Sequence, residues 1–447
     1  MIILQNRRHR FKPSYNNMDT LTIIKRVLQI LIAILLIVFI FSSIRMKKSF
    51  SNQKLLADNI HNIESNEDNQ INTSNENNID IDSNIASENS QSNEQKNESK
   101  STSINMTLLG DIMCPKTICK DAYNSDLDTY DFSYIFEDIK YNIQTADISI
   151  GNLETTFAGS SNEYGNSTKL NAPERLAINL KKLGIDVLTT ANNHSFDYGY
   201  SGLESTIDYL DEADIAHTGT FKSEEEQNKI LIQNVKGINI AILSYTYGTN
   251  KNTIPSDKSY SVNLIDKDLI QKQLSMAKSQ SPDLICVSMH WGTEYKTEPN
   301  NEQTELVDFL FDNGADIIIG NHPQVLQPME KRELSLPDGT KKDVFVVYSL
   351  GNFLADQSKP NSRNSAILNL NITKNEDGKI NISTAKYTPI YIFKNTTKNT
   401  NQFRILNLKN LISAYDAGYT EDYTSANYAT FKNELANIQN ILGDKIK

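Results

Sequence analysis

The sequence predicts an α/β domain that follows a membrane-spanning helix and a disordered linker. Three observations lead to this prediction. An apolar segment near the N-terminus is long enough to cross a bilayer, and a polar stretch almost without aromatic residues follows it. The rest of the chain alternates apolar strand patterns with helical patterns, which is typical of sheets covered by helices.

Composition and charge exclude several classes of protein. The chain has 447 residues and a net charge of −11. This charge argues against a nucleic-acid-binding protein, because binding to phosphates needs a basic face. Three cysteines cannot build a disulfide framework, and their spacing does not fit a four-thiolate zinc site. We therefore expect no nucleic-acid partner.

The predicted membrane anchor is the apolar run 27–44. Basic residues precede it, so residues 1–26 should stay in the cytoplasm and the C-terminal part should face outward. We expect an uncleaved, single-pass anchor in the cell membrane. The alternative is a cleaved signal peptide, but the run is long and no small-x-small cleavage site follows it.

The segment 45–103 is predicted to be a disordered linker. It is rich in Asn, Ser and Glu, and it holds too little apolar surface to offset its chain entropy. A linker of this length would hold the following domain away from the membrane.

The globular domain is expected over 104–357, with residues 358–447 completing or flanking it. Apolar runs predict these strands: 104–109, 146–150, 187–190, 238–245, 284–289, 317–319 and 344–348. Helices are predicted from Pro173 to Gly184, from a capping box of Ser201 and Glu204, and over 301–314. Strand-like pieces at 365–372 and 380–391 and a helix over 425–442 end the chain.

Polar side chains follow the predicted strands where ligands of open α/β sheets bind, beyond the carboxyl ends of the strands. The residues in question are Asp111, Asn152, Glu154, Asn192, Asn193, His194, His290, His322 and Asn352. Carboxylate, amide and imidazole groups suit Mn, Fe, Zn or Mg rather than a soft thiolate site. The sequence therefore predicts a divalent metal site at this edge.

Each motif also has a purely structural interpretation. Gly110-Asp111 could be an ordinary turn, Asn192-Asn193-His194 a helix-capping loop, and His290-Trp291 a packed aromatic pair. Taken together, the motifs favour a metal or anion site, because three of the six histidines follow three separate predicted strands. We expect Trp291 to pack beneath the site, the alternative being a wall for substrate.

The ordered motifs resemble those of the CapA/PgsA family of capsule, or poly-γ-glutamate, biosynthesis proteins, which are related to calcineurin-like metallophosphoesterases. The motifs are Gly110-Asp111, Asn152-Leu153-Glu154, Asn192-Asn193-His194, His290-Trp291-Gly292, Asn321-His322-Pro323 and Tyr348-Ser349-Leu350-Gly351-Asn352-Phe353. The resemblance covers 104–357. It implies a metallophosphoesterase-like four-layer αββα sandwich with a metal site at the strand ends.

The resemblance also implies roles for individual residues. Asp111 would be the first metal carboxylate, and Glu154 would occupy the bridging position, with Asn152 as the alternative. Asn193, His290 and His322 would hold the second metal, and His194 would protonate the leaving group. Further pocket positions are Asn152, Asn192, Trp291, Gln324, Ser349 and Asn352.

Two positions depart from the phosphoesterase pattern. Met113 and Gln324 stand where that pattern has histidines. Thioether and amide groups are poor substitutes for imidazole, so we expect one tightly held ion rather than two. Whether hydrolysis occurs stays open.

Three functions remain for the structure to separate. The first is a membrane-anchored extracellular protein of capsule or poly-γ-glutamate synthesis and export, whose partner is an anionic polymer or its synthesis complex. The second is a metal-dependent phosphoesterase unrelated to capsule. The third is a non-catalytic polymer-binding module.

Cys114 and Cys119 could pair outside a cell, but sequence does not decide this.

Overall fold

The computed structural model describes residues 101–165, 168–336, 339–419 and 423–443. The predicted anchor 27–44 and nearly all of the linker 45–103 lie outside the described residues. Within the described part of the chain, no helix combines the length and apolar character needed to cross a bilayer. The described residues form a mixed α/β structure, as the sequence predicts.

The first sheet carries the strands that begin the domain. Its strands lie in the order β16 (Phe403–Asn407), β15 (Ile380–Lys394), β14 (Asn364–Lys374), β1 (Thr102–Ile112), β4 (Ile148–Leu153), β5 (Val187–Thr189) and β6 (Ala216–Thr218). From β1 to β6 the neighbours are parallel, and from β1 to β16 they are antiparallel. The short β13 (Asn352–Leu354) pairs with the end of β1.

The second sheet holds the later half of the α/β pattern. Its strands lie in the order β11 (Leu326–Ser335), β12 (Lys341–Leu350), β10 (Ile317–Asn321), β9 (Leu284–His290), β8 (Ile238–Thr246) and β7 (Leu231–Val235). The four central strands are parallel, and both edge strands are antiparallel to their neighbours. The carboxyl ends of β8, β9, β10 and β12 therefore meet at one edge.

The two sheets face each other across an apolar layer. Alternate residues of β1, such as Met106 and Leu108, pack against alternate residues of β8, β9 and β10, such as Ile242 and Ile319. This alternation follows from the two-residue period of a strand, which sends neighbouring side chains to opposite faces.

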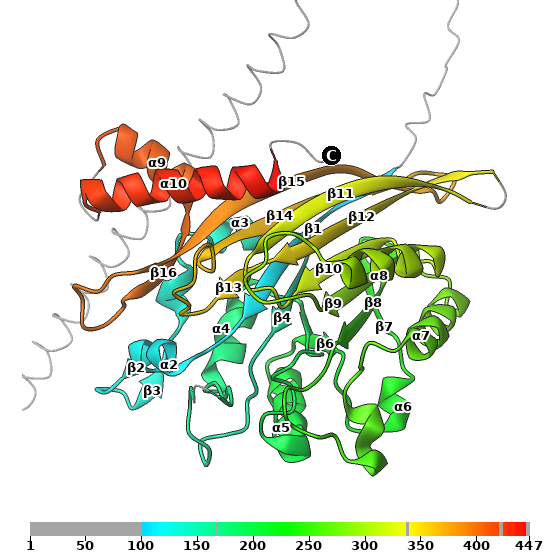
Figure 1. The fold of residues 1–447 in the computed structure, drawn as a ribbon, viewed down its shortest axis with the longest axis horizontal. Coiled ribbons are helices and arrows are strands. Elements are labelled where there is room, and N and C mark those ends of the chain that lie inside the picture. Colours follow the sequence, from blue (N-terminus) through cyan, green and yellow to red (C-terminus); the bar gives the residue numbers. More distant parts are fainter. Residues whose placement is uncertain (1–100, 166–167, 337–338, 420–422, 444–447) are drawn as a thin grey trace, which may run out of the picture. The chain divides into compact units, whose positions relative to one another are not determined.

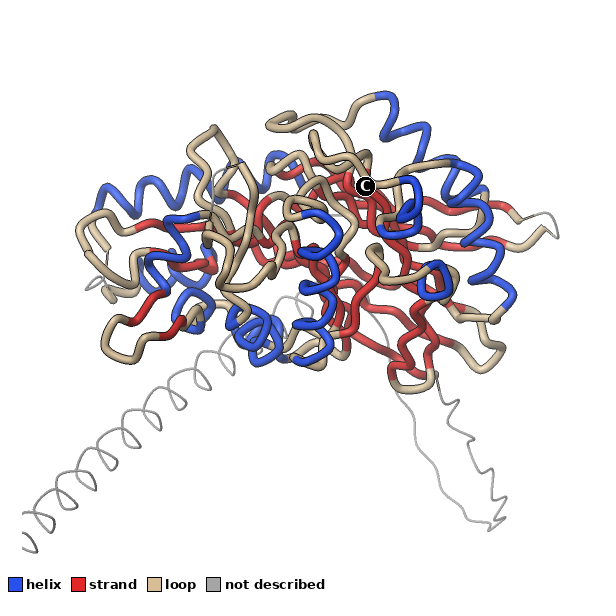
Figure 2. Tube along the Cα trace, turned by 90° about the horizontal axis from the view of Figure 1, so that it is seen from below, coloured by secondary structure: helices blue, strands red, loops and turns tan. Residues whose placement is uncertain are grey.

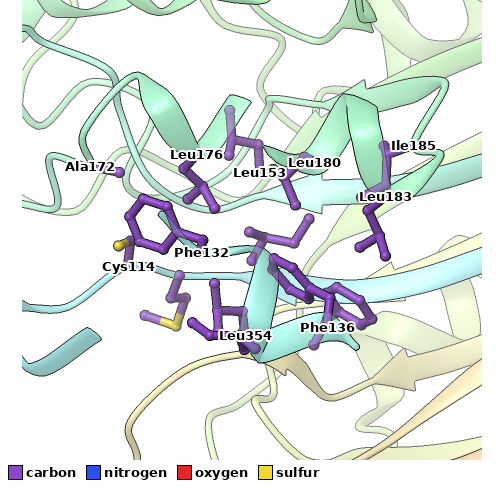
Figure 3. Close-up of a cluster of buried hydrophobic side chains, with 14 of the residues drawn as sticks. Cys114, Phe132, Phe136, Leu153, Ala172, Leu176, Leu180, Leu183, Ile185 and Leu354 are labelled. Atoms are coloured by element: carbon purple, nitrogen blue, oxygen red, sulfur yellow. The ribbon is translucent and has the colours of Figure 1, made fainter. Parts of the chain in front are cut away.

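Helices cover the outer faces of both sheets. Leu176, Leu180 and Leu183 of α4 (Arg175–Leu183) pack with the outward face of the first sheet, and Figure 3 shows this cluster around Phe132 and Phe136. The second sheet is covered by α7 (Lys267–Ser279) and α8 (Asn301–Asp312). Figure 1 shows these helices beside β8 and β9, and in Figure 2 helices flank the central strands.

Two C-terminal helices cover β11, β14 and β15. In Figure 1, α9 (Leu408–Asp416) and α10 (Ser425–Leu442) lie together over these strands, and α10 contacts all three. Phe431, Ile438 and Leu442 of α10 join the core between the sheets. The other helices are α2 (Lys116–Ala122), α3 (Lys140–Gln144), α5 (Gly199–Glu212) and α6 (Glu224–Gln227), and the strands β2 (Tyr123–Asn124) and β3 (Thr129–Tyr130) form a small hairpin.

Several predicted helix ends can be checked directly. Helix α4 ends at Gly184, whose φ of 106° is the left-handed conformation expected of a terminating glycine. Asn300 and Gln303 form a capping box at the start of α8. The predicted capping box at Ser201 is wrong, because α5 begins at Gly199 and Ser201 already lies inside its first turn.

Candidate metal centre

The strand order brings both sheets' polar strand ends to one place. Asp111 of β1 is in register with Asn152 of β4, and Glu154 follows β4 directly. In the second sheet, His290 ends β9 in register with Asn321, which His322 follows. The site is therefore built from residues up to 211 positions apart.

Three buried side chains form the centre of the site. Glu154, His290 and His322 place one donor atom each within 4.8 Å of one another. The Nε2 atom of His290 lies 3.7 Å from Oε1 of Glu154. We call these three residues the donor cluster. A carboxylate with two imidazoles is a ligand set suited to zinc, manganese or iron.

Unpaired atoms show that this cluster fits a cation. Both carboxylate oxygens of Glu154 and Nδ1 of His322 are buried without a hydrogen-bond partner. A buried polar atom without a partner is costly, and a carboxylate costs most of all. A divalent ion would satisfy all three atoms at once, so the residues present fit a metal.

Burial also sets the protonation of the cluster. Burial, with added repulsion from Asp111, raises the pKa of Glu154 well above its usual value. Burial lowers the pKa of His290 well below its usual value and that of His322 to about 4. Both imidazoles are therefore neutral at neutral pH and keep a lone pair to donate.

Asn193 lies beside the donor cluster, and its role as a metal ligand stays a prediction. Its Oδ1 lies 2.8 Å from Nε2 of His290, and its amide nitrogen donates to Asn250. The contact between Nδ1 of His290 and the Asn152 amide, 3.4 Å long, leaves Nε2 facing Asn193 and Glu154. Asn193 thus offers an amide oxygen beside the donor cluster.

Asp111 lies beside the cluster but is already engaged. Its two carboxylate oxygens accept from the Asn152 side chain at 2.6 Å and from the backbone N–H of His322 at 3.1 Å. Burial raises the pKa of Asp111 to about 7, against the opposing effect of these hydrogen bonds. Asn152 is therefore the partner of Asp111 rather than a separate ligand.

The loop after β5 presents His194 at the site. Its Nδ1 lies 2.6 Å from a carboxylate oxygen of Asp197, so Nε2 is the nitrogen left for proton exchange. Asn192 holds this loop, because its Oδ1 accepts from the His194 backbone and its amide donates to the Leu153 carbonyl. The side chain of His194 is 14% exposed, whereas that of Asp197 is fully buried.

Asp197 was missed by sequence reasoning. It also accepts from the Leu170 backbone and the Asn252 side chain, which fixes its carboxylate. The signal that could have found it is its position three residues after His194, where the two side chains can meet across one turn.

Tyr247 was missed as well. It follows β8, and its backbone N–H donates to the His290 carbonyl at 3.0 Å. Its ring centroid lies 4.6 Å from that of His322, and its ring is nearly parallel to that of His290. Tyr247 is 47% exposed and burial raises its pKa to about 12, so it covers the cluster as a protonated phenol.

Three of the further pocket positions serve as structural support. Trp291 is buried, and its Nε1 donates to the Tyr348 carbonyl at 3.0 Å, which confirms the packing interpretation. Ser349 donates to the Val325 carbonyl, and Asn352 donates to the Gln324 and Ser362 carbonyls. These bonds tie the end of β12 to the loop after His322.

Gln324 points its polar group toward Glu294. Its Nε2 donates to a carboxylate oxygen of Glu294 at 3.2 Å, and its Oε1 accepts from Tyr295. It is therefore not part of the donor cluster. The other departure from the phosphoesterase pattern, Met113, is buried in the apolar layer outside the first sheet.

The backbone of the His322 loop is strained. His322 has a φ of 95° and Gln324 a φ of 57°, both in the left-handed region that non-glycine residues rarely adopt. Such conformations cost on the order of 1–3 kcal/mol each and persist only where the surroundings enforce them. Here the strained backbone lets the His322 N–H reach Asp111 while its ring joins the cluster.

Two glycines allow the strands to approach at the site. A Cβ on Gly110 would lie 2.0 Å from the Gly351 carbonyl oxygen, and one on Gly320 would lie 1.8 Å from that of Tyr348. These distances are impossible for any other residue without movement of the backbone. The close approach places Asp111, whose N–H donates to the Gly351 carbonyl, beside the loop that carries His322.

Residues 105–357 match the family model described as "Bacterial capsule synthesis protein PGA_cap". The chain belongs to this family. The match spans most of both sheets and all donor-cluster residues, and it confirms the resemblance seen in the motifs.

Two curated relatives are similar to the family domain. The capsule biosynthesis protein CapA of Bacillus anthracis is 32% identical over 61% of this chain and 64% of its own length. The PGA biosynthesis protein CapA of Bacillus subtilis (strain 168) is 30% identical over 66% of this chain and 73% of its own length. The chain thus spans slightly less than two thirds of the first relative.

Among solved structures, the NAD nucleotidase of Haemophilus influenzae is similar at 14% identity, with a TM-score of 0.40. The likeness covers 78% of this chain and 65% of that protein.

Proposed function

We propose that this chain takes part in the synthesis or export of an anionic surface polymer, capsule or poly-γ-glutamate, and binds one divalent ion at Glu154, His290 and His322. Membership in the capsule synthesis family supports the polymer pathway. The observation that carries the metal site is the buried, unpaired Glu154 carboxylate facing two neutral imidazoles.

The proposed location is the outer side of the cell membrane. The apolar run 27–44 would anchor the chain with residues 1–26 in the cytoplasm, and the linker would carry the domain outward. A net charge of −11 would repel an anionic polymer, so a divalent cation between protein and polymer would offset that repulsion.

One ion is favoured over two. The positions that would complete a second site hold Met113, buried in the core, and Gln324, bonded to Glu294. Asp111, the remaining carboxylate, already accepts hydrogen bonds from Asn152 and the His322 N–H and would be left as the main ligand of a second ion. Of the predicted ions Mn, Fe, Zn and Mg, the two imidazoles of the donor cluster favour Zn, Fe or Mn, because Mg prefers oxygen ligands.

Hydrolysis of a phosphate ester is the second candidate function, in a metallophosphoesterase-like αββα sandwich. An ion at the donor cluster would supply Lewis acidity. The observation that favours hydrolysis is the His194–Asp197 pair, in which Asp197 fixes the ring and His194 Nε2 can pass a proton to a departing oxygen. A polymer-binding module without catalysis would not need this oriented pair.

The test uses the full-length chain purified in detergent. Metal content is measured by inductively coupled plasma mass spectrometry for the wild type, for His290→Ala and for a control, His217→Ala. His217 lies in β6, bonded to Asp211, outside the donor cluster. We expect about one equivalent of metal in the wild type and the control, and a loss of metal in His290→Ala.

The same proteins are then assayed on a generic phosphate ester with added manganese. Metal-dependent turnover that His194→Ala abolishes supports hydrolysis, whereas bound metal without turnover supports polymer handling alone. A wild type that binds no divalent metal would contradict the metal site. Failure of the wild-type gene to restore surface polymer in a deletion strain would contradict the pathway.

A further inference from the structure

Two of the three cysteines meet in the segment that follows β1. Cys114 lies in the loop after β1 and Cys119 in α2, and their sulfur atoms are 3.3 Å apart. Both side chains are buried in the apolar layer outside the first sheet, and Figure 3 shows Cys114 beside Phe132. The third cysteine, Cys286, is buried between the sheets.

The backbone around the pair is held by other interactions. The Pro115 carbonyl accepts from the N–H groups of Ile118 and Cys119, which fixes the first turn of α2. The Met113 N–H donates to the Leu354 carbonyl, which fixes the chain just before Cys114. The two sulfur atoms therefore face each other because of the fold, without needing a bond to bring them together.

The remaining gap can be closed by the side chains. A disulfide bond is about 2.05 Å long, so the sulfur atoms need to approach by roughly 1.2 Å. Small rotations about the two Cα–Cβ bonds provide such a movement. Cys286 offers the contrast, because it lies in a different apolar layer from Cys114 and Cys119.

We propose that Cys114 and Cys119 form an intrachain disulfide that ties α2 to the end of β1. The oxidant is a disulfide, either a small molecule or a protein. Each of the two thiols loses one electron and one proton, a sulfur–sulfur bond forms between them, and the oxidant is reduced to two thiols. The bond would form during folding, before burial closes access to the sulfur atoms.

Burial also makes the bond durable. External thiols have little access to the two sulfur atoms, because Cys114 and Cys119 are at most 3% exposed. Once formed, the disulfide should resist reduction until the domain opens.

The bond would act on the metal site through the chain. Cys114 lies three residues after Asp111, and the Asp111 N–H is bonded to the Gly351 carbonyl. The cross-link would hold this strand end to a helix as well as to its neighbouring strands. Its formation does not depend on the proposed function, since sulfur geometry alone carries it.

The experiment counts thiols in the full-length chain. The protein is refolded in a buffer of oxidised and reduced glutathione, denatured, and alkylated, and the labelled cysteines are located by peptide mass spectrometry. We expect only Cys286 to be labelled, and a peptide joining Cys114 to Cys119 that lacks the mass of two hydrogen atoms. After prior reduction, all three cysteines should be labelled.

Variants make the assignment specific. Cys286→Ser should keep the joined peptide, whereas Cys114→Ser should leave Cys119 labelled under oxidising conditions. Labelling of all three cysteines in the oxidised wild type would overturn the proposal. A joined peptide found only between two chains, seen as a dimer on a non-reducing gel, would overturn it as well. Neither result bears on metal content, so this test and that of the metal site fail independently.

Discussion

The backbone N–H of His322 donates to the carboxylate of Asp111 at 3.1 Å, across 211 positions of sequence. Asp111 lies near the end of β1 in the first sheet, and His322 follows β10 of the second. This hydrogen bond therefore joins the two sheets at the donor cluster. It also explains why His322 adopts its unusual backbone conformation, since the bond and the ring position must both be satisfied.

Replacing Glu154 should abolish metal binding while sparing the fold. Glu154→Gln keeps the shape of the side chain but replaces the carboxylate with an amide, a much poorer ligand. A metal whose free concentration is 100 times its dissociation constant stabilises the folded protein by about 2.7 kcal/mol. We expect added manganese or zinc to raise the melting temperature of the wild type and not that of Glu154→Gln.

Glu163→Gln is the matched control for that experiment. Glu163 is exposed and paired with Lys116, outside the donor cluster, so its variant should respond to metal as the wild type does. A Glu154→Gln protein that still gains stability from metal would show that the ion binds elsewhere.

Asp197→Asn should impair turnover without releasing metal. The amide cannot hold the His194 ring as the carboxylate does, and oriented proton transfer contributes on the order of 10²–10⁴-fold. If hydrolysis occurs, the turnover number should fall by at least about tenfold while the metal content stays at the wild-type level. Steady-state kinetics with metal analysis checks this, and equal loss of turnover and metal would instead indicate a structural role.

Gly320→Ala should destabilise the domain strongly. The new Cβ would lie 1.8 Å from the Tyr348 carbonyl oxygen, so the strands would have to separate. We expect a loss of about 3 kcal/mol or more in the free energy of unfolding. Gly248→Ala is the control, because its Cβ would meet nothing within 4 Å. Urea denaturation compares the two, and similar stabilities would contradict the close packing.

Glu330→Gln should lower stability at neutral pH but not in acid. Burial opposes ionisation of Glu330, yet hydrogen bonds from Arg332 and Tyr348 outweigh it and hold its pKa below the usual value. The stability contributed by the ionised form is present above the unfolded-state pKa of about 4.3 and is lost as the pH falls through the folded pKa. We expect a loss of roughly 1 kcal/mol near pH 7.

Denaturation at neutral pH and well below the usual carboxyl pKa measures this difference. Glu333→Gln, in the same strand, removes a pair with Lys341 in which both side chains are more than half exposed, so it should change little. If the difference in the free energy of unfolding between Glu330→Gln and the wild type is the same in acid as at neutral pH, ionisation of Glu330 does not contribute to stability.

Local patterns in the sequence predicted much of the fold. The apolar runs before Asp111, His290 and His322 were recognisable as strands because their side chains are buried on both faces. Strand β11 was missed, since it carries Pro328 and many charged residues. It lies at the edge of its sheet, where a proline is tolerated.

The site was only partly accessible from sequence. Donor types and strand ends pointed to Glu154, His290 and His322, but nothing in the sequence shows which strands share a sheet. The hydrogen bonds that Asp111 accepts from Asn152 and from the His322 backbone depend on that arrangement. The same holds for Tyr247, which reaches the cluster only because β8 lies next to β9.

The separate origins of the donors have a mechanical consequence. Glu154 follows a strand of one sheet and His290 ends a strand of the other, and the layer between the sheets is mostly apolar, with a few hydrogen bonds at the site such as that from His322 to Asp111. A slip of one residue between the sheets, about 3.3 Å, would carry these two side chains out of reach of a common ion. The donor cluster therefore exists only while the two sheets keep their alignment, so it reports on how the sheets pack.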